Sequence, residues 1–194
     1  MNGSSVDSAV QEAMRAVDRR FFLSDANRPL AAIDAPIAIG FDQTTSQPSL
    51  IGHMISLLSL GKDDAVLEIG TGSGYPSAIL ARLAGEVYTL EIVPELFSSA
   101  MDRLGKLKIS NLWGKNQSGH VPWGDGKTFS KIVVWAACEE LPTVLLDQLR
   151  QGGTMVLPIG PHGESQRLAV VKKNADGTWQ RSDSIGVRFV PFRR

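Results

Sequence analysis

The sequence lacks the features that several classes of protein require. It has one cysteine, Cys138, which stands inside the apolar run "IVVWAAC", so no disulfide can form within the chain and we expect a buried thiol. The 20 basic and 20 acidic residues cancel, and no long run of Lys or Arg offers a surface to nucleic acid. With one cysteine and three scattered histidines, metal-ligand spacing is absent, and we expect no metal site.

Long apolar runs are absent as well. No stretch approaches the 18 apolar residues that a membrane-spanning helix needs, and the first 22 residues have no continuous apolar segment of the kind found in signal peptides. We therefore expect a soluble, cytoplasmic protein with neither a membrane nor a nucleic-acid partner. An apolar content of 43% in 194 residues is enough for one globular domain with an ample core.

Helical and strand-like patterns alternate along most of the chain. Apolar side chains at helical spacing predict a helix over residues 6–21, with Ser5 or Ser8 as its N-cap. Three prolines and little periodicity predict an irregular segment at 24–48, and a further helical run covers 50–60. Strands are then expected at 65–69, 86–91, 131–137 and 154–160, and the helices between them begin at Ser77, Pro94 and Leu141.

This alternation predicts an α/β fold, in which a doubly wound, mostly parallel sheet carries helices on both faces. After Gly160 the pattern changes to strand and turn, and Asp176-Gly177 has the composition of a hairpin turn. We therefore expect antiparallel C-terminal strands at the edge of the sheet.

A glycine-rich turn follows the first of these strands in "AVLEIGTGSGY". Gly70, Gly72 and Gly74 fill its first, third and fifth positions, whereas a dinucleotide-binding turn needs the first, third and sixth, and the sixth is Tyr75. No Lys-Ser or Lys-Thr pair completes a phosphate-binding loop. Ser73 lies directly between two glycines, which does not fit a nucleophile elbow.

Acidic residues mark the ends of two strands beside this turn. Glu91 stands 21 residues after Gly70, where an acid can accept hydrogen bonds from the ribose hydroxyls of a nucleoside. Glu68 places a second carboxylate just before the turn. Two acids without an anion-binding device favour a cationic nucleoside such as S-adenosylmethionine. The alternatives are close packing for the glycines and a solvated strand end for Glu91.

The segments "IGFDQTTSQP", "VLEIGTGSGY", "LPTVLLDQLRQGGTMVLPIG" and the closing "VRFVPF" resemble the protein-L-isoaspartate O-methyltransferase family, from about Arg15 to the end of the chain. The resemblance implies a Rossmann-like methyltransferase fold, S-adenosyl-L-methionine as cofactor, and isoaspartyl-containing peptides or proteins as substrates. It also implies one methyltransferase domain over 1–194, with an N-terminal helical and substrate-loop segment at 1–60 and a cofactor-binding core at 61–194.

Individual site residues follow from matching these motifs. Ser46 corresponds to the family's serine between cofactor and substrate, which predicts a catalytic role, and Thr44 and Thr45 are expected to bind substrate in the same loop. Without the resemblance, Ser46 would be a turn residue before Pro48. The predicted cofactor-binding residues are Glu68, Gly70, Thr71, Gly72, Glu91, Ser118 and Gly119.

The sequence departs from the family at three places. Gln117-Ser118-Gly119 stands where Gly-Asp-Gly usually places an aspartate against the adenine, and a literal "GDG" occurs later at residues 124–126. Either Ser118 replaces the acid or a shifted loop uses Asp125. Ala32 stands where an aromatic residue is common near the peptide-binding surface, and Ser130 stands where an aspartate is usual.

Carboxyl methylation fits this set of residues, because a carboxylate is already ionised at neutral pH and needs no strong base to attack a methyl sulfonium. We therefore expect an S-adenosylmethionine-dependent carboxyl methyltransferase that acts on L-isoaspartyl residues in damage repair. The alternatives are a relative that methylates another carboxylate or small molecule, and a non-catalytic S-adenosylmethionine-binding module.

Overall fold

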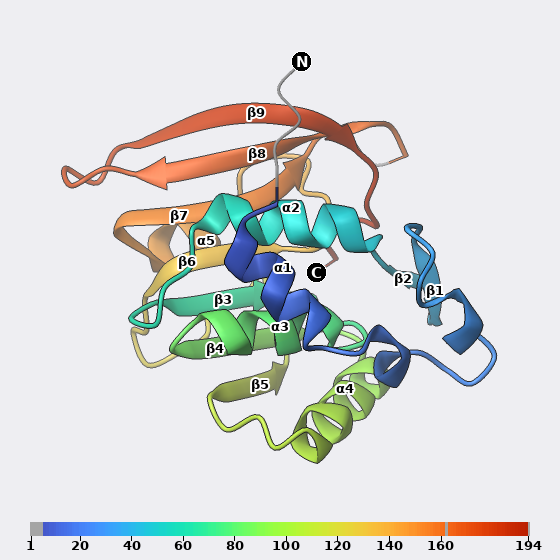
Figure 1. The fold of residues 1–194 in the computed structure, drawn as a ribbon. Coiled ribbons are helices and arrows are strands. Elements are labelled where there is room, and N and C mark those ends of the chain that lie inside the picture. Colours follow the sequence, from blue (N-terminus) through green and yellow to red (C-terminus); the bar gives the residue numbers. More distant parts are fainter. Residues whose placement is uncertain (1–5, 162, 194) are drawn as a thin grey trace.

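The computed structural model describes residues 6–161 and 163–193, and a seven-stranded sheet lies at its centre (Figure 1). The strand order is β5-β4-β3-β6-β7-β8-β9. The bounds are β3 (Ala65–Ile69), β4 (Glu86–Glu91), β5 (Leu112–Asn116), β6 (Phe129–Val134), β7 (Leu149–Ile159), β8 (Gln166–Lys173) and β9 (Trp179–Val187). The pairs from β5 to β7 are parallel, and β8 and β9 pair antiparallel with their neighbours. The predicted fold class, including the antiparallel C-terminal edge, is confirmed.

The central strands are apolar on both faces because helices cover both. Val66 of β3 belongs to one core cluster, and its neighbour Leu67 belongs to the other. Successive side chains of a strand point to opposite faces, so a strand buried on both sides reads as the continuous apolar run by which β3 was predicted. Ser130 joins β6 to this strand, because its hydroxyl accepts from the backbone N of Ala65 and donates to the carbonyl of the same residue.

Helices pack on the two faces of the sheet as expected. The bounds are α1 (Ser8–Arg15), α2 (Pro48–Leu58), α3 (Tyr75–Leu83), α4 (Pro94–Lys106) and α5 (Thr143–Gln148). In Figure 1, α1, α2 and α3 lie together in front of the sheet, and their apolar side chains form one core cluster with Leu104 of α4. Leu145 and Leu146 of α5 pack into the other cluster.

The N-terminal helix is shorter than the sequence pattern predicted. Its N-cap is Asp7, whose side chain accepts a backbone hydrogen bond, so the prediction of Ser8 was wrong, and Ser5 lies outside the described residues. Asp18 then caps a separate 3-10 helix, η1 (Arg19–Phe22), in the same way. A carboxylate that accepts from backbone N–H groups starts a new helix instead of continuing the old one.

The segment at 24–48 is more regular than predicted. After a short 3-10 helix, η2 (Arg28–Leu30), the strands β1 (Ile37–Gly40) and β2 (Gln43–Thr45) form an antiparallel hairpin. Its two turn residues, Phe41 and Asp42, have φ values of 55° and 56°. Hairpin turns of this kind usually carry Asn or Gly, and their absence at these positions explains why the sequence gave no signal.

Two further strands differ from the prediction. β5 was not predicted, because it is a half-exposed edge strand in which Gly114 and polar residues interrupt the apolar pattern. β6 ends at Val134 and not at residue 137, which frees Trp135 to leave the sheet at its carboxyl end. Among the described helices, none combines the length and apolar character needed to cross a membrane.

Candidate functional site

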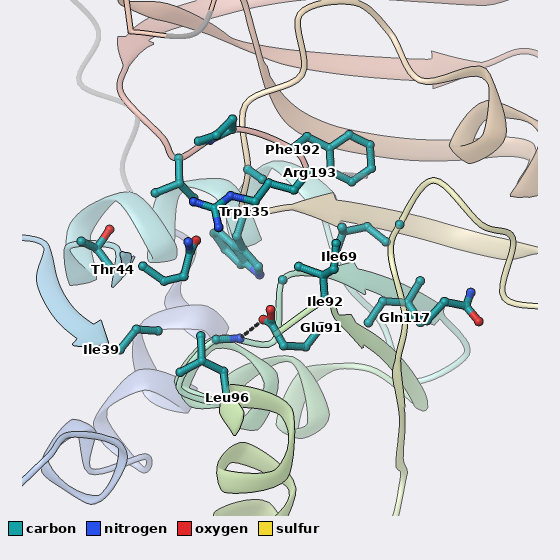
Figure 2. Close-up of a pocket in the computed structure, with 18 residues that line it drawn as sticks. Ile39, Thr44, Ile69, Glu91, Ile92, Leu96, Gln117, Trp135, Phe192 and Arg193 are labelled. Carbon is teal, nitrogen blue, oxygen red and sulfur yellow. Dashed lines mark hydrogen bonds between the residues drawn. The ribbon is translucent and has the colours of Figure 1, made fainter. Parts of the chain in front are cut away.

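A cavity opens at the carboxyl ends of the central strands (Figure 2). The strand order reverses between β3 and β6, and ligands of doubly wound sheets bind in the crevice at such a reversal. We call this space the glycine-turn cavity. It is lined by Ile39, Gln43, Thr44, Ile69, Gly70, Gly72, Leu90, Glu91, Ile92, Leu96, Gln117, Gly119, Trp135, Ala136, Val190, Pro191, Phe192 and Arg193.

The glycine turn forms one wall of this cavity. Gly70 and Gly72 have φ values of 93° and 54°, a left-handed conformation that residues with a side chain rarely adopt. A Cβ atom at Gly72 would also lie 3.3 Å from Cδ1 of Ile39 in the hairpin. The backbone N of Gly70 donates to the carbonyl of Leu90 at 2.8 Å, which fixes the turn against β4. The turn thus presents bare backbone to the cavity.

Glu91 lies on the cavity wall at the end of β4 and is 6% exposed. Its Oε2 accepts from the backbone N of Gly72 at 2.8 Å, and its Oε1 accepts from the backbone N of Val93 at 3.0 Å. A carboxylate has about four acceptor sites, so two protein donors leave capacity for further hydrogen bonds. Glu91 can therefore accept from two hydroxyl groups of a ligand while the turn holds it in place.

Glu68 is placed differently. Its side chain is fully buried and does not line the cavity. Its Oε2 accepts from the hydroxyl of Ser77 at 2.5 Å and its Oε1 from the indole Nε1 of Trp135 at 2.9 Å. Burial raises the pKa of Glu68 to about 7, against the donated hydrogen bonds, which lower it. Glu68 thus meets the cavity only through Trp135, whose ring does line it.

The loop after β5 approaches the cavity with Gln117 and Gly119 but not with the side chain of Ser118. The Ser118 hydroxyl donates to the carbonyl of Arg193 at 3.2 Å and accepts from the backbone N of His120 at 3.2 Å. Asp125 lies in an exposed turn with a φ of 55° and does not line the cavity. The geometry gives no support to a shifted loop that would use Asp125.

A second, larger cavity adjoins the first, and we call it the loop cavity. Ser46, which follows the hairpin, lines it, and Thr44 and Trp135 line both cavities. A narrow crevice between them is lined by Thr44, Thr45, Ser46, Gly70, Thr71, Gly72, Ser73, Pro76 and Trp135. The hydroxyl of Thr71 lies 2.6 Å from that of Thr89 inside the core, so Thr71 offers mainly its backbone to the crevice. The structure therefore brings the predicted substrate loop beside the glycine turn.

Trp135 and the C-terminal tail, residues 190–193, were not predicted as site residues. The backbone N of Ala137 donates to the carbonyl of Val190 at 2.8 Å, and the backbone N of Phe192 donates to the carbonyl of Ala137 at 2.9 Å. These bonds hold the tail against the mouth of the cavity. Trp135 lies inside the strand expected at 131–137, so no pattern in the sequence indicated its place at the site, and nothing local in the tail indicates where it folds.

The whole chain, residues 1–194, matches the profile of the protein-L-isoaspartate(D-aspartate) O-methyltransferase family. A protein-L-isoaspartate O-methyltransferase of Nitrosococcus oceani is 43% identical over 97% of this chain and 85% of its own length. One from Anaeromyxobacter dehalogenans is 43% identical over 96% of this chain and 90% of its own.

A solved structure shares the fold of this chain. A Plasmodium falciparum protein, assigned provisionally as a protein-L-isoaspartate O-methyltransferase and solved with S-adenosyl-L-homocysteine, superposes with a TM-score of 0.84. It is 23% identical, and the match covers 96% of this chain and 91% of that one. A profile match over the full length, together with relatives above 40% identity, shows that this chain belongs to the protein-L-isoaspartate(D-aspartate) O-methyltransferase family.

Proposed function

We propose that this chain transfers the methyl group of S-adenosyl-L-methionine to the free carboxylate of L-isoaspartyl residues in peptides or proteins. The observation that carries the proposal is the junction of two cavities at Thr44 and Trp135. The glycine-turn cavity takes the methyl donor and the loop cavity takes the acceptor. The described part of residues 1–60 supplies the acceptor loop and, with Ile39, Gln43 and Thr44, one wall of the donor site. Residues from 61 onward supply the rest of the donor site of one methyltransferase domain.

The donor side fits a nucleoside without phosphates. Glu91 retains acceptor capacity for the two ribose hydroxyls, and the bare backbone at Gly70 and Gly72 permits close approach of the methionine part of the donor. Gln117 and Gly119 lie on the wall that we assign to the adenine. A Cβ atom at Gly119 would come within 2.8 Å of the Phe192 ring, so only glycine fits this wall without displacing the tail.

The acceptor side needs to orient a nucleophile, not to generate one. S-adenosylmethionine supplies an activated methyl group: a carboxylate oxygen bonds to the methyl carbon while the carbon–sulfur bond breaks and its electron pair stays on sulfur. Ser46 and Thr44 offer hydroxyl groups beside the crevice through which the carboxylate approaches. Their role is to align that carboxylate with the methyl group, and alignment alone can lower a barrier by several kcal/mol, about 7–11 in the best cases.

The experiment is labelled-methyl incorporation into an isoaspartyl peptide and into its normal aspartyl twin, across a concentration series. We expect incorporation into the isoaspartyl peptide alone, because a pocket that aligns one carboxylate misplaces the other by a methylene group. Ser46→Ala should lower kcat while the affinity for S-adenosylhomocysteine changes little. Ser98→Ala, on an exposed position of α4, is the matched control and should leave both unchanged.

Three results of these assays would contradict parts of the proposed function. If the folded protein binds S-adenosylhomocysteine but labels neither peptide at any concentration, the isoaspartyl substrate is excluded. Labelling of both peptides at similar rates would also exclude the proposed selection between them. A normal rate for Ser46→Ala would remove Ser46 from the catalytic machinery and leave the reaction itself in place.

A further inference from the structure

Among the residues that the structure describes, Trp135 and Thr44 alone line the glycine-turn cavity, the loop cavity and the crevice between them. Trp135 follows directly after β6, at the point where the strand order reverses. The residue is 9% exposed. Figure 2 shows its ring near the middle of the side chains that line the glycine-turn cavity, above Glu91 in this view. A methyl group that passes from one cavity to the other must cross beside this ring.

The ring is held by its polar edge. The indole Nε1 donates to Oε1 of Glu68 at 2.9 Å, and Glu68 is itself fixed by the hydroxyl of Ser77 and is fully buried. A tryptophan has only one hydrogen-bond donor in its side chain. Because Glu68 already accepts from that donor, the ring offers a ligand its carbon surface and its π electrons, in an orientation set from inside the core.

The crevice beside the ring contains no charged group among the described residues that line it. Its polar groups are the backbone of the glycine turn and the hydroxyls of five residues, Thr44, Thr45, Ser46, Thr71 and Ser73. Of these hydroxyls, that of Thr71 is paired with Thr89 and that of Ser73 accepts from the backbone N of Tyr75. An electron-rich indole is the strongest partner for a cation that such a wall can provide, and tryptophan is the best of the aromatic residues in this role. The methyl donor carries a positive sulfonium, whereas the product S-adenosylhomocysteine is a neutral thioether.

We propose that the Trp135 indole binds the sulfonium of the methyl donor by a cation–π interaction and so selects the charged donor over the neutral product. The inference rests on the family's use of S-adenosylmethionine and is independent of the acceptor. Glu68 is a positioning residue in this arrangement, since it acts only through the ring. Loss of the positive charge on transfer removes the attraction, which favours release of the product from the site.

The test is calorimetric titration of S-adenosylmethionine and of S-adenosylhomocysteine, without any peptide. The readout is the ratio of the two dissociation constants. We expect Trp135→Leu to change that ratio about 2- to 30-fold against S-adenosylmethionine. Trp135→Phe should change it in the same direction by less, because the smaller ring is a weaker π partner. Trp113→Leu, at a 44% exposed tryptophan on β5, is the matched control and should leave the ratio unchanged.

If Trp135→Leu and Trp135→Phe weakened the binding of both ligands equally, the inference would be overturned, because the ring would then contact the ligand without distinguishing its charge. Weakening confined to S-adenosylhomocysteine would overturn it as well. Thermal melts establish that the variants are folded, and Trp135→Phe decides the question if Trp135→Leu does not fold. Peptide turnover, measured separately, keeps failure of this inference distinct from failure of the proposed function. A variant that loses its preference for S-adenosylmethionine can still methylate isoaspartyl peptides. A protein that methylates no isoaspartyl peptide can still show that preference.

Discussion

The most demanding prediction concerns Arg19, which lies in η1 far from the glycine turn in sequence. Its side chain is buried, at 5% exposed, and its two terminal nitrogens donate to four backbone carbonyls. Three of these carbonyls follow η2, at Ala31, Ile33 and Ala35, with distances of 3.3, 3.1 and 3.3 Å. The fourth belongs to Ser46, at 3.0 Å. One guanidinium therefore joins the segment after η2 to the predicted catalytic loop.

The magnitude follows from what Arg19→Ala would leave behind. Hydrogen bonds to a charged group contribute about 1.5–3 kcal/mol each, but the four share one side chain and the carbonyls can rehydrate as the segment relaxes. We therefore expect a loss of about 3–5 kcal/mol in the free energy of unfolding, which is well below the sum of four independent bonds. Arg20→Ala should change the free energy of unfolding far less, since Arg20 pairs with Asp18 at the surface, where solvent screens the pair.

Urea denaturation of the wild type and both variants measures the difference. Because the segment after η2 could detach without global unfolding, limited proteolysis within residues 31–35 and the kcat for an isoaspartyl peptide provide a second readout. Arg19→Ala should be cut faster and turn over more slowly than Arg20→Ala. If the two variants have the same unfolding midpoint, the same cleavage rate and the same kcat, the reasoning from the four carbonyls is refuted.

Four further predictions concern single positions. If residue 118 occupies the adenine position, Ser118→Asp should keep or tighten S-adenosylhomocysteine binding by calorimetry, once the side chain turns from the Arg193 carbonyl toward the cavity. Asp125→Asn should then leave that binding unchanged, whereas a large loss from Asp125→Asn alone would restore the shifted loop. Burial raises the pKa of Glu68 from 4.5 to about 7, so the free energy of unfolding should fall as pH rises between these values. Urea denaturation across this pH range should show a weaker pH dependence for Glu68→Gln than for the wild type. Ala32→Tyr should lower the KM for a generic isoaspartyl peptide, measured by labelled-methyl transfer; an unchanged KM would detach Ala32 from the peptide surface. Burial raises the pKa of the Cys138 thiol to about 12, so native protein should resist iodoacetamide until it is unfolded.

The sequence indicated those parts of the molecule in which a local pattern determines the structure. The strands at 65–69 and 86–91 were predicted with their bounds, because each is a short apolar run buried on both faces. The glycine turn and Glu91 were predicted together. A strand, a turn and a helix follow one another in the sequence there, so the next strand and the acid at its end can be located by spacing. The hairpin turn at Phe41 and Asp42 escaped prediction because its left-handed conformation is enforced by the surroundings and not by glycine.

The rest of the site depends on segments that meet only in space. Trp135 looked like one more apolar residue of a strand, and its position at the junction of two cavities follows from where β6 ends. Nothing in the sequence singled out Arg19, and its burial follows from the path of a loop that ends 27 residues later at Ser46. Periodicity and spacing contain no information on such long-range contacts.

The opening of the tail at 190–193 is coupled to the binding of a ligand in the glycine-turn cavity. Because its residues form part of the cavity wall, any opening that breaks the hydrogen bonds at Ala137 also removes contacts from a bound nucleoside. By linkage, a ligand that binds only the closed wall lowers the population of the open state by a factor of one plus the ratio of the free ligand concentration to its Kd. The amide hydrogens of Ala137 and Phe192 should therefore act as native reporters, exchanging with deuterium more slowly as the nucleoside fills the cavity.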